Sequence, residues 1–120
     1  MKKLQLLLGF ISLIFISNVS ADICEETNVT INAIRPVSAS NHNEKHKNTV
    51  ELHHSERNYC SLSDCAPANR YRVIIDANDT HVVSAAYMAF VAGKKVNITI
   101  DTGLGNRSGI CVISYLTVLN

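Results

Sequence analysis

The chain has 120 residues, of which 47% are hydrophobic, and a formal net charge of +1 at pH 7. This balance excludes the basic field that attracts nucleic acids or anionic membranes. The sequence has no tryptophan and few other aromatic residues, which argues against base stacking as a function. We therefore expect no nucleic-acid partner.

The first 21 residues have the three parts of a Sec-type signal peptide. Lys2 and Lys3 form a positively charged start, residues 4–16 are almost entirely apolar, and residues 19–21 are the small-residue cleavage site Val-Ser-Ala. The apolar run is too short for a comfortable membrane span, and the sequence has no longer one. We predict cleavage after residue 21, an exported product in the periplasm or outside the cell, and one domain over residues 22–120.

The first predicted strand covers residues 28–34 and follows a short polar lead, residues 22–26. Its inward-facing residues are expected to be Val29, Ile31 and Ala33. Pro36 is expected to end or kink the strand, because proline cannot donate to a sheet ladder. Residues 38–48 are polar throughout and are predicted to form a loop.

The second predicted strand covers residues 49–54, with Val50 and Leu52 facing inward. A second loop is predicted over residues 55–69. The third strand is predicted over residues 70–76, which are rich in β-branched and aromatic side chains.

A helix is predicted over residues 81–92, which contain neither glycine nor proline. Asp79 is the expected N-cap, because its carboxylate can accept from backbone N–H groups at the helix start. Gly93 supplies the left-handed residue that ends many helices. Residues 94–101 then alternate as a strand, with three apolar residues on one face: Val96, Ile98 and Ile100.

A glycine-rich turn is predicted over residues 102–109, followed by a last strand over residues 110–118. The continuous apolar character of this strand indicates burial on both faces for part of its length. The predicted order is three strands, one helix and two strands. A mainly β chain with this order is typical of the five-stranded OB-fold barrel, in which the helix closes one end.

The predicted helix is unusual because neither of its sides is charged. Its inward face would hold Val82, Val83, Ala86, Ala89 and Phe90. The opposite side holds Ser84, Ala85, Met88 and Ala92, whereas a surface helix normally shows a charged stripe. Two explanations stay open: loops of the same chain cover the helix, or a neighbouring subunit does.

All four cysteines lie in the predicted mature part: Cys24, Cys60, Cys65 and Cys111. An even number of cysteines in a small exported domain is typical of disulfide bonds. One pairing joins Cys60 to Cys65 and Cys24 to Cys111, and the alternative joins Cys111 to the Cys60/Cys65 region. A long-range bond would contribute about 3–5 kcal/mol to stability.

Four histidines lie between residues 42 and 54, near two glutamates: His42, His46, His53, His54, Glu44 and Glu51. Such side chains can bind zinc or copper, so a small metal-binding periplasmic protein is one hypothesis. However, His53 and His54 are consecutive on a predicted strand and would point to opposite faces. We therefore expect no metal site and no cofactor.

The sequence also lacks the usual catalytic signatures. It has no Gly-x-Ser-x-Gly elbow and no glycine fingerprint after a strand. Its glycines at 103, 105 and 109 fall in a predicted turn. Asp76 and Asp101 end strands, and the cysteines are expected to be oxidised. We expect no enzymatic activity.

Two features together resemble the B subunits of bacterial AB5 toxins, particularly the pertussis-like and subtilase-cytotoxin-like group. One is the leader followed by a disulfide-tied, five-stranded OB-like domain. The other is the segment from Asp79 to Ile100, with its capped helix and the turn Ala-Gly-Lys-Lys-Val at residues 92–96, followed by Cys111. The resemblance implies a non-catalytic subunit that forms a homo-oligomeric ring of five, binds cell-surface glycans and receives the helical tail of a toxin A subunit.

The resemblance also implies a sugar site along the side of the barrel. The candidate glycan-binding residues are Ser38, Ser40, Asn41, Arg57 and Tyr59. A sugar site usually has an aromatic platform, and this chain offers only Tyr59 and Tyr71 near loops, so two alternatives stay open. In the first, the five candidate residues are ordinary solvated loop residues. In the second, the chain is a small exported OB-like domain that binds a protein, such as an inhibitor or envelope factor, without a toxin partner.

Overall fold

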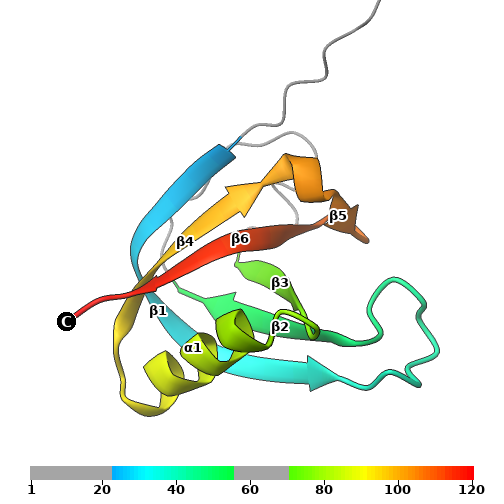
Figure 1. Ribbon diagram of the computed structural model, residues 1–120, viewed down its shortest axis with the longest axis horizontal. Helices are drawn as coiled ribbons and strands as arrows, with labels where there is room; N and C mark the ends of the chain where they lie inside the picture. The colour runs from blue at the N-terminus through cyan, green and yellow to red at the C-terminus, as the bar shows by residue number, and fades with distance from the viewer. Residues whose placement is uncertain (1–22, 56–70) are drawn as a thin grey trace, which may run out of the picture.

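The computed structural model describes residues 23–55 and 71–120, which form a mainly β domain with one α-helix (Figure 1). The elements are β1 (Ile23–Val37), β2 (Thr49–His54), β3 (Arg72–Asp76), α1 (Thr80–Val91), β4 (Lys95–Asp101), η1 (Thr102–Leu104), β5 (Asn106–Arg107) and β6 (Ile110–Val118). The predicted order of three strands, a helix and two further long strands is confirmed. The predicted leader and its cleavage site lie outside the described residues.

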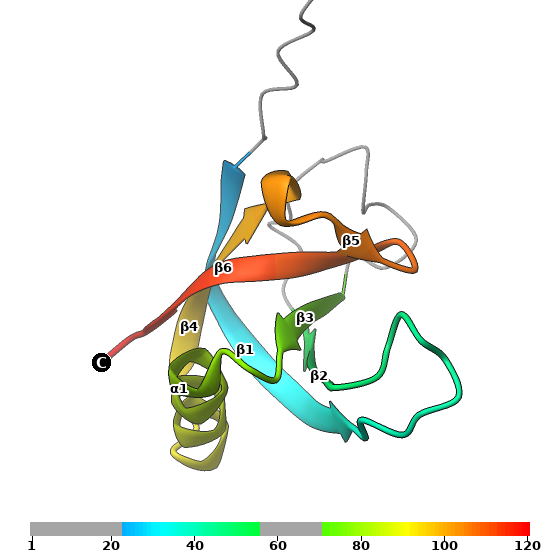
Figure 2. The same ribbon diagram turned by 45° about the vertical axis from the view of Figure 1, so that its right-hand side comes forward.

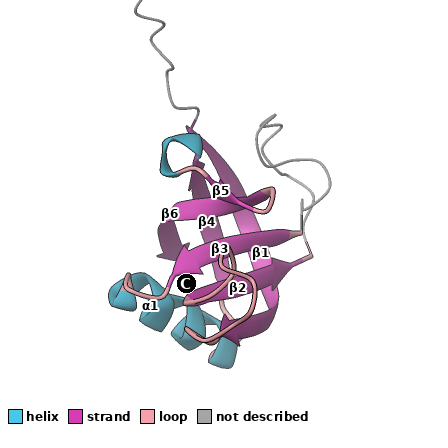
Figure 3. Cartoon of the chain, turned by 90° about the vertical axis from the view of Figure 1, so that its right-hand side faces the viewer, coloured by secondary structure: helices cyan, strands magenta, loops and turns pink. Residues whose placement is uncertain are grey.

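The strands form a single sheet that closes into a ring. Its order is β3-β2-β1-β4-β6-β5, and an additional pairing of β3 with β6 joins the two ends of the five longer strands. The β3–β6 pairing is parallel, whereas the other pairings are antiparallel. Figure 3 shows the strands around a common centre, with α1 across one end. Closure gives β3 a second partner and so reduces the exposed edges of the sheet, while β5 and each half of β1 are paired on one side.

Strand β1 is longer than the sequence predicts, because it pairs with two different strands along its length. Its residues 23–30 pair with β4, and its residues 31–37 pair with β2. The predicted polar lead is therefore part of the strand. Pro36 does not end the strand, since it lies in the second half, where β2 is the one paired neighbour and a missing N–H is tolerated.

Two irregularities in β1 change which side chains face the core. Asn28 has a φ of 59°, and the pairing with β4 shifts register between Glu26 and Val29. A second shift, between Ile31 and Ala33, reverses the alternation. The expectation that Ala33 faces inward is therefore wrong: Ala33 is exposed, and Ile34 packs against the core instead.

The core lies inside the ring and follows the predicted alternation in the other strands. Val50 and Leu52 of β2 are buried, as are the three apolar residues predicted for β4. The predicted two-sided burial of the last strand is also confirmed, because residues 110–113 are all buried. The sequence did not predict the buried polar residues Glu26, Glu51 and His54.

Helix α1 ends at a left-handed glycine, as predicted, but its first turn lacks the predicted side-chain cap. Gly93 has a φ of 65°, and the N–H groups of Gly93 and Lys94 donate to the carbonyls of Phe90 and Ala89, respectively. This pair of bonds is the Schellman motif. Asp79 occupies the N-cap position, but its side chain makes no capping hydrogen bond. The predicted capping role of its carboxylate is therefore wrong.

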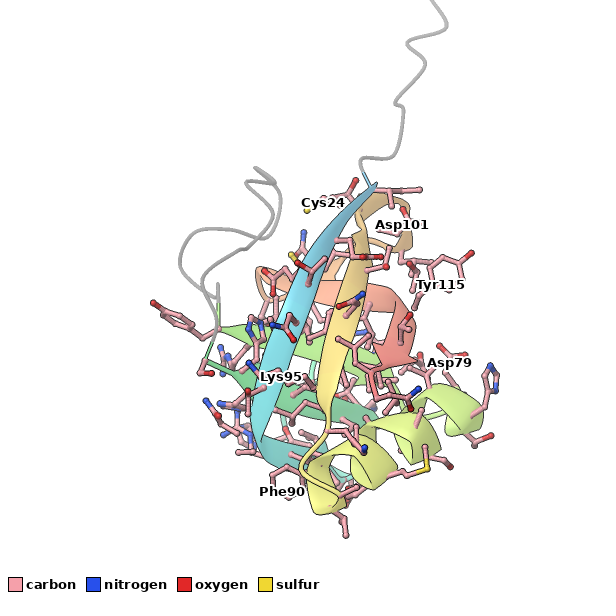
Figure 4. The ribbon with its side chains drawn as sticks, turned by 90° about the vertical axis from the view of Figure 1, so that its left-hand side faces the viewer. Cys24, Asp79, Phe90, Lys95, Asp101 and Tyr115 are labelled. Atoms are coloured by element: carbon pink, nitrogen blue, oxygen red, sulfur yellow. The ribbon has the colours of Figure 1, made fainter. Side chains whose placement is uncertain are left out.

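The helix contacts β1 and β6 through small residues and leaves an apolar face outside. Ala86 and Ala89 are fully buried. Phe90, which was expected to face inward, is 41% exposed, because the two alanines already bring the helix close to the sheet. The exposed apolar residues of the helix are Tyr87, Met88, Phe90 and Val91. Figure 4 shows Phe90 near the C-terminal end of the helix, with Cys24 at the far end of the molecule.

Both cysteines in the described residues are oxidised. Cys24 and Cys111 are disulfide-bonded, and neither is a free thiol. The pairing of the four cysteines stays a prediction, because Cys60 and Cys65 lie outside the described residues. Among the residues that the structure describes, no helix has the length and apolar character needed to cross a membrane.

Candidate functional site: a polar hollow beside a buried carboxylate

An open hollow of about 350 Å³ lies where β1 runs into the loop of residues 38–48. We call it the polar hollow, and its lining consists of Arg35, Pro36, Val37, Ser38, Asn41, His42, Asn43 and His46. Figure 2 shows this loop projecting from the end of the ring between β1 and β2. The lining therefore combines hydroxyl, amide, imidazole and guanidinium groups with two apolar side chains.

Hydrogen bonds within the loop hold this lining in place. The Asn41 and Asn43 side-chain oxygens accept from the backbone N–H groups two residues further on, at 2.9 and 3.0 Å. The carbonyl of Ser38 accepts from the N–H groups of Asn41 and Asn48, which ties the two ends of the loop together. Such side-chain turns fix a polar loop without a hydrophobic core of its own.

Two of the predicted glycan-binding residues line the hollow. These are Ser38 and Asn41. Ser40 lies beside them, because its hydroxyl is 2.9 Å from the Ser38 hydroxyl, and its backbone N–H donates to the same oxygen. Arg57 and Tyr59 lie outside the described residues.

A buried carboxylate lies next to the hollow and is surrounded by cationic and imidazole groups. Glu51 of β2 is fully buried, and its partners come from β1, β3, the loop of residues 38–48 and β2 itself. The Nε of Arg35 donates to Glu51 Oε2 at 2.7 Å, and its Nη2 contacts the same oxygen. Arg72 Nη1 lies 3.6 Å from Oε1, and His46 Nδ1 lies 3.5 Å from it. His53 Nε2 is 3.5 Å from Oε2. We call these five residues the Glu51 cluster.

The balance of these contacts keeps Glu51 ionised. Burial alone would raise the pKa of this carboxyl, but the Arg35 hydrogen bond, the charges of Arg35 and Arg72 and the contact with His53 together outweigh it. The net effect is a pKa below the ordinary value. Arg35 is thus held by a fixed negative charge, while its side chain stays 56% exposed and lines the hollow.

Two members of the cluster, Arg35 and His46, also line the hollow. Sequence reasoning missed Arg35 and the role of Glu51. Arg35 lies directly opposite Glu51 in the β1–β2 pairing. This relation depends on strand register and is not visible from spacing along the chain.

The consecutive histidines of β2, His53 and His54, lie on opposite faces of the strand. His54 is buried inside the ring, with its Nε2 3.3 Å from Glu26 Oε2, while His53 faces Glu51 on the other side of β2. The two do point to opposite faces, as predicted. Within residues 23–55 and 71–120, no group of three or more histidine, cysteine, aspartate or glutamate residues is arranged to hold a metal ion.

Comparisons with known proteins identify no relative for this chain: no protein-family model, no curated protein and no solved structure matches it.

Proposed function

We propose that the chain is an exported, non-catalytic binding subunit of the AB5 B-subunit type, which recognises a glycan at the polar hollow. The observation that carries this proposal is the hollow itself. It contains two of the residues predicted for the sugar site, Ser38 and Asn41, and it lies where β1 runs into the loop of residues 38–48.

The chemistry of the lining suits a sugar. Sugar hydroxyls both donate and accept hydrogen bonds, and serine, asparagine, histidine and arginine side chains supply both functions. The volume of about 350 Å³ lies within the range of small-molecule sites, roughly 300–1,000 Å³. Because the loop is already fixed by its own hydrogen bonds, binding loses little conformational entropy.

The strand order supports the five-stranded OB-fold-like barrel that this proposal needs. In the OB-fold, a Greek-key barrel of five strands carries ligands on its surface and in its loops. The β3–β6 pairing that closes the ring and the position of α1 across one end agree with that arrangement. The oxidised state of Cys24 and Cys111 supports a disulfide-tied domain.

The outer face of α1 supports self-association into a ring, with five copies as the expected number. Met88 is 60% exposed and Val91 is 82% exposed, and they lie one turn apart on the helix. The same face favours the second candidate function, a small exported OB-like domain that binds another protein, such as an inhibitor or envelope factor, and has no toxin partner.

A glycan array probed with the mature chain tests the proposal. We expect binding to a defined set of glycans and a five- to tenfold loss of affinity in His42→Ala, about the value of one hydrogen bond. The matched control is His81→Ala, which removes an exposed histidine at the start of α1, away from the hollow. No signal on the array, or equal losses in the two variants, would reject the hollow as a glycan site.

A further inference from the structure

The two oxidised cysteines of the described residues lie on different strands of the ring. Cys24 lies near the start of β1, and Cys111 lies near the start of β6. Both are disulfide-bonded, and neither is a free thiol. Because the chain has four cysteines, the possible partners of each within one chain are the other of these two, Cys60 and Cys65.

The register of the sheet separates Cys24 from Cys111. Cys24 lies opposite Ile100 in the β1–β4 pairing, and Ile100 lies opposite Ile113 in the β4–β6 pairing. Cys111 lies two residues before Ile113 on β6. The two cysteines are therefore two strand spacings apart, about 9.5 Å, and two residue rises apart, about 6.7 Å. These offsets together place their Cα atoms roughly 10–12 Å from each other.

The curvature of the ring does not remove this separation. A disulfide requires its two Cα atoms to lie within about 7 Å of each other. If curvature shortened the two strand spacings to about 7 Å, the offset along the strands would still hold the Cα atoms of Cys24 and Cys111 roughly 9–10 Å apart. A bond between Cys60 and Cys65 would then leave both oxidised cysteines without a partner in the chain.

The connection between β2 and β3 begins and ends beside the two oxidised cysteines. At its start, His54 Nε2 lies 3.3 Å from Oε2 of Glu26, which is two residues from Cys24 on β1. At its end, Val73 of β3 pairs directly with Cys111 of β6. The chain therefore leaves β2 next to the first half of β1 and enters β3 next to β6.

The other two cysteines lie within this connection and are close enough along the chain to reach both positions. Cys60 follows His54 by six residues, and Cys65 precedes Val73 by eight. Extended segments of these lengths span at most about 20 and 27 Å. Since neighbouring strands are about 4.8 Å apart, both oxidised cysteines lie within that reach.

We propose that Cys24 bonds Cys60 and that Cys111 bonds Cys65. The two disulfides would join the first and the last long strand of the ring to the connection between β2 and β3. Each bond forms from two thiols, whose two electrons and two protons pass to a disulfide oxidant of the export compartment by thiol–disulfide exchange. The redox state of the compartment thus controls these links, and the inference is independent of the polar hollow and its ligand.

Peptide mapping of the mature chain without reduction tests the pairing. Free thiols are alkylated first, and digestion at mildly acidic pH prevents exchange. Trypsin, which cuts after lysine and arginine but not before proline, gives three cysteine-containing peptides: residues 22–45, 58–70 and 108–120. We expect them to be joined as one species that reduction separates into three. A species that joins residues 22–45 to 108–120, with residues 58–70 oxidised internally, would overturn the inference.

A second digestion identifies the partner of each cysteine. Cleavage before Asp64 separates Cys60 from Cys65 within the peptide of residues 58–70. We expect Cys24 to stay joined to the fragment with Cys60, and Cys111 to the fragment with Cys65. Exchanged partners would overturn the assignment.

Serine variants give a readout that does not depend on digestion. If the bonds are separate, Cys24→Ser and Cys111→Ser each remove a different one, so the double variant should unfold about 5 °C or more below either single variant. Equal unfolding temperatures in all three variants would indicate one shared bond and contradict the proposal. Far-UV circular dichroism checks that each variant folds, and the map of the unmodified chain decides the pairing if one does not.

Discussion

At the scale of single residues, the most informative position is Glu51. A buried carboxylate is unfavourable unless cations and hydrogen bonds compensate for the lost hydration. Arg35 and Arg72 provide that compensation from the two strands on either side of β2. The same arrangement fixes a guanidinium at the wall of the polar hollow, so the residue links stability to the candidate site.

Replacement of Glu51 by glutamine should lower the free energy of unfolding by about 1–3 kcal/mol, because the hydrogen bond from Arg35 loses its charge assistance and two arginines lose their counter-charge. The loss should stay moderate because both arginines are partly exposed. Urea unfolding at pH 7 measures it. The matched control is Glu44→Gln, whose carboxylate is 77% exposed and should change stability by less than about 0.5 kcal/mol. Similar effects of the two substitutions would contradict the assigned role of Glu51.

Stability should also fall in acid, and two carboxyls account for it. The pKa of Glu51 is lowered as described above. The pKa of Asp76 is lowered chiefly by the hydrogen bond from the backbone N–H of Asn78. Burial acts in the opposite direction, and the hydrogen bond and charge of Arg107 lower the pKa further. Both groups stabilise the fold above their ordinary values of 4.5 and 3.8, and this contribution is lost as the pH falls through the lower folded-state values.

Thermal unfolding at a series of pH values checks this expectation. The wild type should lose stability below about pH 4.5, and Glu51→Gln should show a shallower decline. A wild-type profile that is flat from pH 7 to pH 3, or an equal slope in the variant, would contradict the assigned causes.

The sequence predicts part of the candidate site at this scale. Ser38 and Asn41 were proposed from the family resemblance and from their place in a polar loop after a strand, and both line the hollow. Arg35 and Glu51 were missed because both lie in strands, where a charged residue is usually taken as a solvated outer position. Only the register of β1 and β2 shows that they face each other.

At the scale of elements, the best predicted feature is the end of α1, and the least predictable is β1. Glycine after a run of helix-forming residues has a direct local cause, since a left-handed residue is required there. The length of β1 has no local cause, because it depends on having β4 as a partner for one half and β2 for the other. Its bulges also reverse which residues face inward, as at Ala33 and Ile34.

Replacement of Gly93 by alanine should lower the free energy of unfolding by about 1–2 kcal/mol. The cause is backbone strain at a φ of 65° and not a clash, because a Cβ at this position meets no atom within 4 Å. Gly93→Asn should cost less, since asparagine tolerates this conformation better. Urea unfolding of the three proteins provides the comparison, and an alanine variant as stable as the wild type would contradict the role of Gly93.

At the scale of the whole molecule, the pairing of β3 with β6 closes the ring, and α1 presents exposed apolar side chains outside it. These side chains are the surface that we expect a second copy to cover. The order of the elements was predictable from the sequence, and the OB-fold expected from that order implies a closed sheet. The residues that close the ring were not predictable, because the β3–β6 pairing joins segments far apart in the chain.

Native mass spectrometry of the mature chain should detect an oligomer, with five copies as the expected number. Replacement of Met88 and Val91 by glutamate should yield monomers, because charged groups in an apolar interface lose hydration without gaining a partner. The control is His81→Glu, which adds the same charge at the exposed start of the helix. A wild type that is monomeric at micromolar concentration would contradict self-association.

The central claim is that the polar hollow is the ligand site. The most direct measurement is an amide chemical-shift map of the mature chain with the strongest glycan from the array. We predict that the largest shifts fall on Arg35 and the loop of residues 38–48, and that His42→Ala reduces them while His81→Ala does not. Shifts centred on α1, or on the opposite side of the ring, would contradict the claim.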